Sequence, residues 1–288
     1  MKEERFIRAM LLALALTAIS GLALITAFIF HAGVPLIVQV GLKDFLLSSN
    51  WYPTDPQPQF GIFPMIVGSL AVTAGAMVIG VAFGLGCAVL LTQFCPPAWV
   101  AVIKPSIELL AGIPSVVYGF IGVVILVPAI REHLGGPGLS VLAASVVLGI
   151  MTLPTITSIS VDALRAVPRS YREGAIALGA TEWQTTHMVV FKAARSGIVA
   201  AVILGMGRAV GETMAVIMVA GNTLDVPHGI LDPVRTLTSN IALEMGYAAG
   251  DHQRALFATG VTLFVIIMIL NTIALRFSRR RSGKVLAR

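Results

Sequence analysis

Arg208 and Glu212 are two ionisable residues in an otherwise apolar stretch, four positions apart. An ionisable side chain at the centre of a membrane helix costs about 2.5–3.5 kcal/mol on insertion scales, so such residues usually have a partner or a function. Because residues four apart lie on one helix face, the two side chains can pair. A guanidinium also presents paired donors that match a tetrahedral oxyanion. The spacing therefore predicts an anion pathway at Arg208, Glu212 and the adjoining Thr213, in which Glu212 holds the guanidinium in place. An ion pair with a purely structural role is the alternative.

Glu108 is a further acid at the start of an apolar stretch, and Pro114, Ser115 and Tyr118 follow it. Proline has no backbone N–H and so frees a carbonyl in the preceding helical turn, and the glycines nearby allow close helix packing. We expect a kinked, tightly packed helix. Kinked or broken helices near the midplane line substrate paths in transporters, so these four residues are candidates for the pathway or its gate. Plain packing is the alternative, and Glu108 can instead reach the membrane surface or a basic neighbour.

The polar connection at about 162–192 carries clear local signals. Ser170 with Glu173, and Thr181 with Gln184, each have the spacing of a capping box. In a capping box the two side chains satisfy free amides at the start of a helix. The connection is therefore predicted to form two short helices joined by a turn.

Small residues occupy this hairpin, which we place at residues 170–186. Gly174 and Ala175 give its first helix a smooth surface beside Glu173, and Gly179 suits the left-handed position that ends a helix. A smooth helix can seat in a groove of another protein, so docking onto a partner is predicted. The alternative is a basic amphipathic hairpin that lies on anionic lipid.

The chain that must position these residues is 57% hydrophobic and only 12% charged, whereas soluble domains carry about 25% charged residues. Its mean hydropathy is +0.90. A helix needs about 20 apolar residues to cross a hydrocarbon core. The first apolar run is too long for a signal peptide and lacks a small-residue cleavage site, so it is kept as a span. We predict an all-α, polytopic membrane protein with six transmembrane helices, near residues 10–30, 64–92, 105–130, 139–161, 195–220 and 255–277.

Lysine and arginine alternate between rich and poor connections, and basic connections stay on the cytoplasmic side of a membrane. The N-terminal segment, the 162–195 connection and the C-terminal tail are rich in them, whereas the loops at 31–63, 131–138 and 221–254 hold few. We predict that both termini are cytoplasmic. The sequence pI of 9.7 then reflects contact with lipid head groups, and no nucleic-acid partner is needed to explain it.

Motifs for bound metal or for hydrolysis are missing from the sequence. Cys87 and Cys95 are interpreted as free thiols, and no His, Cys or carboxylate cluster has metal-ligand spacing. The chain contains no His-Glu-x-x-His, no Gly-x-Ser-x-Gly and no Gly-x-x-x-x-Gly-Lys-Ser/Thr. We therefore expect a transport subunit without cofactors, not an enzyme, with any ATP hydrolysed on a partner chain.

The hairpin motif Glu173-Gly174-Ala175, followed by Gly179 and by Val-Val-Phe at 189–191, resembles the EAA loop of ABC importer membrane subunits. That loop reads Glu-Ala-Ala, three residues, Gly, nine residues, Ile-x-Leu-Pro. Here Gly174 replaces the first Ala, and Lys192 stands where the family usually has Pro. The resemblance implies the ABC type I importer permease fold. It also implies that the hairpin is a coupling helix that inserts into a cleft on a separate ATPase.

Two further runs narrow the resemblance: ELLAGIPSVVYGFIG at 108–122 and GRAVGETMAV at 207–216. Both are similar to signatures of phosphate ABC importer permeases. Such importers contain two kinds of permease, PstC-like and PstA-like, and the Met-Ala-Val at 214–216 resembles the PstC-like kind. The resemblance extends from about residue 50 to the end.

This family resemblance implies a specific set of partners. They are a PstA-like second permease subunit, two copies of a cytoplasmic ATP-binding subunit, a phosphate-binding protein on the outer face and membrane lipid. The location implied is the inner (cytoplasmic) membrane.

By segment, we expect an N-terminal helix and outer loop at 1–63, the importer transmembrane domain at 64–277 and a basic tail at 278–288. The same machine for another oxyanion, such as sulfate, molybdate or tungstate, is the nearest alternative. A secondary anion carrier or channel, or a non-transporting scaffold or sensor, is a more distant one.

Overall fold

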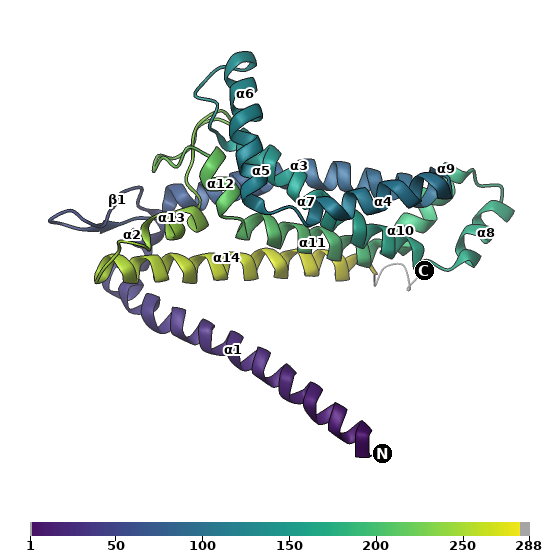
Figure 1. Ribbon diagram of the computed structural model, residues 1–288, viewed down its shortest axis with the longest axis horizontal. Helices are drawn as coiled ribbons and strands as arrows, with labels where there is room; N and C mark the ends of the chain where they lie inside the picture. Colours follow the sequence, from purple (N-terminus) through teal and green to yellow (C-terminus); the bar gives the residue numbers. More distant parts are fainter. Residues whose placement is uncertain (1, 283–288) are drawn as a thin grey trace. The chain divides into compact units, whose positions relative to one another are not determined.

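The computed structural model describes residues 2–282, and helices make up most of it (Figure 1). The chain divides into two compact units, residues 1–63 with 241–264 and residues 64–240 with 265–288. Most of the basic tail predicted at 278–288 lies outside the described residues.

The first unit begins with the long helix α1 (Lys2–Val40), which ends at Gly41, where φ is +94°. The short helix α2 (Leu42–Leu47) and a two-stranded hairpin, β1 (Trp51–Tyr52) and β2 (Gln59–Phe60), follow. The strands are antiparallel, with Trp51 opposite Phe60. This polar hairpin belongs to the outer loop predicted from the sequence.

The C-terminal half of α1 packs on the first half of α14 (Asp251–Ser282). A Cβ on Gly33 would lie 2.7 Å from the backbone nitrogen of Ala258, so the two helices approach to backbone contact. The rings of Phe28 and Phe257 meet edge to face, with centroids 5.4 Å apart. Small residues thus allow the approach that helices in lipid use in place of a hydrophobic driving force.

The second unit is built around α7 (Val141–Arg165), the most buried of its helices. Its neighbour α3 (Phe63–Val89), which continues into a π-helical turn, η1 (Leu90–Phe94), approaches it through glycines. A Cβ on Gly84 would lie 2.9 Å from Ile156 on α7, and one on Gly205 of α11 (Arg195–Gly211) would lie 2.7 Å from the same side chain. Ile156 is therefore clamped between two glycine-bearing helices.

The third predicted span, 105–130, is not one continuous helix. It is divided into α4 (Pro97–Ala111) and α5 (Ser115–Ile121), which continues through the π-helical turn η2 (Gly122–Leu126) into α6 (Val127–His133). The kink expected at Pro114 is a full break between Ala111 and Ser115, because proline removes the donor and its ring clashes with the preceding turn.

The fifth predicted span, 195–220, is also divided. Helix α11 ends at Gly211, and α12 (Met214–Val219) begins after two non-helical residues. This break was not predicted, since no proline is present there. A loop of mostly half-buried residues then leads to α13 (Leu237–Glu244).

The connection between α7 and α11 forms the predicted hairpin, made of α8 (Arg169–Ala177), α9 (Glu182–Gln184), the π-helical segment η3 (Thr185–Val190) and α10 (Phe191–Ala193). The capping box of Thr181 and Gln184 is confirmed, and Gly179 has φ +85° as predicted. The box at Ser170 is wrong, because Pro168 is the N-cap and the helix starts before Ser170.

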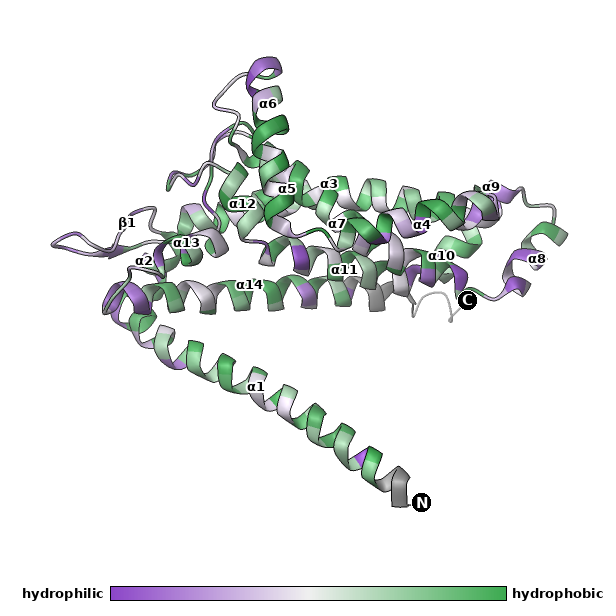
Figure 2. Ribbon diagram, in the orientation of Figure 1, coloured by the Kyte–Doolittle hydropathy of each residue, from purple (hydrophilic) through white to green (hydrophobic). Residues whose placement is uncertain are grey.

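Five helices of the described part are long and apolar enough to cross a membrane, namely Phe6–Val40, Phe63–Phe94, Ser115–His133, Val141–Arg165 and Asp251–Arg276. The segment Glu182–Ala193 with Arg195–Gly211, bent by 70°, makes a sixth if counted as one span. The described residues therefore hold five or six candidate spans against the six predicted. Figure 2 shows these helices as mainly hydrophobic.

Candidate functional site

The two broken helices of the second unit pack directly on each other through α5 and α12. A Cβ on Gly119 would lie 2.8 Å from Met218 Sδ and 3.0 Å from Ala215 Cα, and one on Gly122 would lie 2.8 Å from Val219 Cγ1. No side chain fits between the two backbones at these positions. The helices that follow the two breaks therefore form one tightly packed junction.

The break in the third span is closed by a side chain. Pro114 has no N–H to offer the carbonyl of Leu110, and the hydroxyl of Tyr118 donates to that oxygen at 2.8 Å. The Ile113 amide also donates to it, at 3.3 Å. Ser115 is half-buried as the first residue of α5. Tyr118 thus fixes the geometry of a broken helix, a role that its motif alone did not reveal.

The break in the fifth span places Glu212 differently from the prediction. Glu212 is extended, with φ −69° and ψ 135°, and its Oε1 accepts from the Ala215 amide at 3.3 Å. Within residues 2–282 no ion pair joins it to Arg208, so the predicted pairing is wrong. The four-residue rule requires a continuous helix, and α11 ends at Gly211. The carboxylate instead caps α12, while the Thr213 hydroxyl donates to Gly211 O at 3.3 Å.

A buried cluster of hydroxyls supports this second break. Thr238 donates to the carbonyl oxygen of Glu212 at 2.9 Å, and Thr236 lies 3.0 Å from Thr238 and 2.8 Å from Ser239. The Leu237 amide donates to Ser69 Oγ on α3 at 2.9 Å. The sequence analysis missed this cluster. The signal was the Thr-Leu-Thr-Ser-Asn run at 236–240, a typical helix start.

Arg208 lies in the last turn of α11, exposed at the edge of the junction. In the described part of the chain no hydrogen bond or ion pair engages its guanidinium. Arg235, by contrast, donates to Asn222 O and Asn240 Oδ1, both at 3.0 Å. The C-terminal end of a helix favours a cation, and the donors of Arg208 can serve an external anion.

Glu108 has a partner on its own helix. Its carboxylate lies 3.8 Å from Lys104 Nζ, which is also 3.8 Å from Asp162 on α7. The side chain of Glu108 is about half exposed, and an exposed pair of this kind contributes less than about 1 kcal/mol. Glu108 therefore makes its contact with Lys104 on α4 and takes no part in the contacts at the Pro114 break, where Tyr118 bonds to Leu110.

The residues predicted to couple to an ATPase lie on the outside of the hairpin. Glu173, Gly174 and Gly179 are exposed and Ala175 is half-buried, and a Cβ on either glycine would meet nothing within 4 Å. Large apolar side chains are exposed beside them, including Leu178 at 91%. Contiguous exposed apolar surface of this kind marks interaction sites.

Two contacts connect the hairpin to the end of the second span. The guanidinium of Arg172 donates to Gln93 Oε1 on η1. The rings of Trp183 and Phe94 have centroids 6.3 Å apart. A force on the hairpin would therefore be transmitted directly to η1. Across the described residues, no group of three or more His, Cys, Asp or Glu could hold a metal ion.

Comparison with known proteins places this geometry in context. The family profile described as binding-protein-dependent transport system inner membrane component matches residues 80–283. The Bacillus subtilis protein named "Probable ABC transporter permease protein YqgH" is 43% identical over 95% of this chain and 90% of its own length. The "Phosphate transport system permease protein PstC" of Haemophilus influenzae is 35% identical over 84% of this chain and 83% of its own length.

Among solved structures, an inward-facing MetNI methionine ABC transporter chain superposes with a TM-score of 0.59. It covers 76% of this chain and 97% of its own length at 22% identity. At that identity the likeness shows the fold, which is that of an ABC type I importer permease.

Proposed function

Because the chain belongs to the family of binding-protein-dependent transport system inner membrane components, we propose that it is the membrane-spanning permease subunit of an ATP-driven importer of inorganic phosphate. The observation that carries the proposal is the position of Arg208, a cation beside the junction of two broken helices. No described residue accepts a hydrogen bond from its guanidinium. The curated relatives named as phosphate transport permeases supply the substrate class.

Phosphate would supply the hydrogen-bond acceptors that no described residue of the chain supplies to Arg208. A guanidinium binds two oxygens of a tetrahedral oxyanion through parallel N–H donors. Glu212 is the first residue after α11 and is near Arg208 in sequence. Repulsion by its carboxylate would lower the affinity of Arg208 for a dianion, so that the substrate is released along the pathway. Thr213 completes this pathway, with Pro114, Ser115 and Tyr118 shaping its other wall through the α5–α12 contact.

The direction of transport requires energy. Moving one charge against the membrane potential costs about 2.3 kcal/mol per 100 mV, so a dianion costs about twice that. A passive pore would release phosphate, and ATP hydrolysed on a partner chain supplies the work. The chain itself would carry no catalytic residue.

Coupling to that ATPase runs through the hairpin. Its exposed face at Glu173, Gly174, Ala175 and Gly179 would seat in a cleft on the cytoplasmic ATPase, present in two copies. The tie between Arg172 and η1 would carry movement into the spans. A PstA-like permease and an outer phosphate-binding protein complete the assembly in the inner membrane, with both termini cytoplasmic.

Uptake of radiolabelled phosphate tests the proposal, in cells that lack their own high-affinity system and express this chain with its partner subunits. We expect Arg208→Ala to abolish uptake and Arg208→Lys to reduce it, because lysine keeps the charge without the paired donors. Arg254→Ala is the matched control, since Arg254 pairs with Asp251 at an exposed site. Sulfate uptake is measured in parallel.

Full phosphate uptake by Arg208→Ala would contradict the anion pathway. Sulfate uptake without phosphate uptake would favour the alternative of an importer for another oxyanion. Uptake without any ATPase would favour a secondary carrier.

A further inference from the structure

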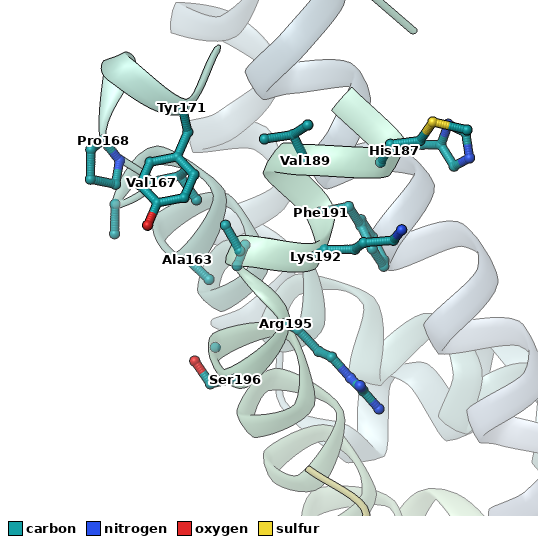
Figure 3. Close-up of a pocket in the computed structure, with 15 residues that line it drawn as sticks. Ala163, Val167, Pro168, Tyr171, His187, Val189, Phe191, Lys192, Arg195 and Ser196 are labelled. Carbon is teal, nitrogen blue, oxygen red and sulfur yellow. The ribbon is translucent and has the colours of Figure 1, made fainter. Parts of the chain in front are cut away.

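A cavity of about 1130 Å³ opens between the end of α7, the start of α8, the segments η3 and α10, and the start of α11 (Figure 3). Most of its lining is apolar, including Val167, Phe191 and Gly197. The site is larger than the 300–1,000 Å³ typical of small-molecule pockets. Neither Arg208 nor the exposed coupling residues line it, so it is separate from the proposed pathway.

The charged residues that line this cavity are all basic. Lys192 and Arg195 line it together with His187, and none of its described lining residues is acidic. Lys192 is exposed and Arg195 half-buried, and neither has an ion pair in the described part of the chain. In Figure 3 both side chains extend toward the same side. The cavity therefore combines apolar walls with two cations that lack an anion.

Its position matches the level of lipid head groups. The cavity lies where the apolar helix α7 ends, at Arg165, and α11 begins, at Arg195. Basic pockets between membrane helices at the cytoplasmic side are a recognised mode of binding anionic lipid head groups. An apolar wall next to the cations offers the acyl chains a surface that a free anion would not use.

We propose that this cavity binds one anionic phospholipid of the cytoplasmic leaflet, with its phosphate at Lys192 and Arg195 and its chains against Val167 and Phe191. The choice of the cytoplasmic leaflet rests on the membrane orientation given in the proposed function, whereas the choice of an anionic phospholipid does not. A segment of the ATPase is a poorer occupant, because only Tyr171 and Met188 of the hairpin's large exposed apolar side chains line the cavity. Ile176, Trp183 and Leu178, which at 91% is the most exposed of them, lie outside it and form a separate face suited to a protein.

Native mass spectrometry of the purified, delipidated full-length chain tests this, by titration with phosphatidylglycerol, phosphatidylcholine or inorganic phosphate. The test variant is Lys192→Gln with Arg195→Gln. The matched control is Arg165→Gln with Arg169→Gln, which removes two neighbouring charges outside the lining. We expect the test variant to bind phosphatidylglycerol about 30-fold more weakly, since two basic groups at about 1 kcal/mol each give this factor. We expect the control to bind it as the wild type does.

Equal phosphatidylglycerol binding by the test and control variants would overturn the proposal, as would equal binding of phosphatidylcholine by the wild type. Binding of inorganic phosphate alone, lost in the test variant, would assign the cavity to free anion. Association with the ATPase is measured separately, by co-purification. Unchanged lipid binding with loss of ATPase association in the test variant would overturn the proposal and assign the cavity to the ATPase.

A further variant, Lys192→Arg with Arg195→Lys, keeps both charges and should retain binding; if it loses lipid while remaining folded, the head-group assignment is wrong. Because the assay measures binding to the purified chain and not transport, a failure of phosphate uptake leaves its result intact, and the two proposals fail separately.

Discussion

Replacing Tyr118 by Phe isolates the one hydrogen bond that closes the break at Pro114. The hydroxyl donates to Leu110 O at 2.8 Å, and its loss leaves that carbonyl with only the longer 3.3 Å bond from the Ile113 amide. Hydrogen bonds between membrane helix segments average about 0.6 kcal/mol and reach about 1.7 kcal/mol. The variant should therefore open the break roughly 3- to 16-fold more often.

Hydrogen exchange measured by mass spectrometry on the chain in nanodiscs reports this opening. Amide exchange at Gly112 and Ile113, which lie in the break and donate to carbonyls of the last turn of α4, should speed up by that factor in Tyr118→Phe, while exchange in α7 stays the same. Tyr52→Phe is the control, since Tyr52 is an exposed residue of the outer hairpin. Unchanged exchange at the two amides in Tyr118→Phe would refute the reasoning that the hydroxyl holds the break.

Three other contacts yield predictions. Arg172→Ala should leave ATPase binding intact but lower phosphate uptake severalfold, because the contact with Gln93 is lost; release of the ATPase would instead show that the arginine serves docking. Glu244→Ala removes the buried acceptor, 2.9 Å from an indole N–H and 2.8 Å from an imidazole nitrogen, and should lower stability by about 2 kcal/mol and the melting temperature by roughly 4–8 °C; a scanning-calorimetry midpoint equal to wild type would contradict this. In Gly119→Ala, overpacking should lower the free energy of unfolding by about 1–3 kcal/mol, partly offset by the roughly 1 kcal/mol by which alanine favours a helix over glycine. Gly86→Ala, with open space around it, should be neutral or stabilising. Equal thermal stability of the two variants would refute the close α5–α12 contact.

Sequence patterns predicted the spans well, because burial in lipid demands long apolar helices whatever their packing. Pro114 announced a break because its missing N–H is a property of the residue itself. The break at Glu212 had no such local cause. It depends on Thr238, 26 residues later, which satisfies the Glu212 carbonyl, and periodicity cannot reveal a contact at that distance.

The same distinction explains the two capping boxes. Thr181 and Gln184 complete theirs within one turn, so spacing sufficed. At Ser170 the preceding Pro168 begins the helix earlier and moves the serine into its first turn. For Arg208 and Glu212, residue type alone drew attention to the two positions, but the predicted pairing assumed a continuous helix, and α11 ends at Gly211.

Transport by purified components tests the central claim most directly. The chain is reconstituted in proteoliposomes with its second permease, the ATPase and the phosphate-binding protein, and uptake of radiolabelled phosphate is measured with and without ATP. The account predicts ATP-dependent uptake that Arg208→Ala abolishes and Arg254→Ala retains, with the ATPase still bound in both. Uptake that is independent of ATP, or equal in wild type and Arg208→Ala, would contradict it.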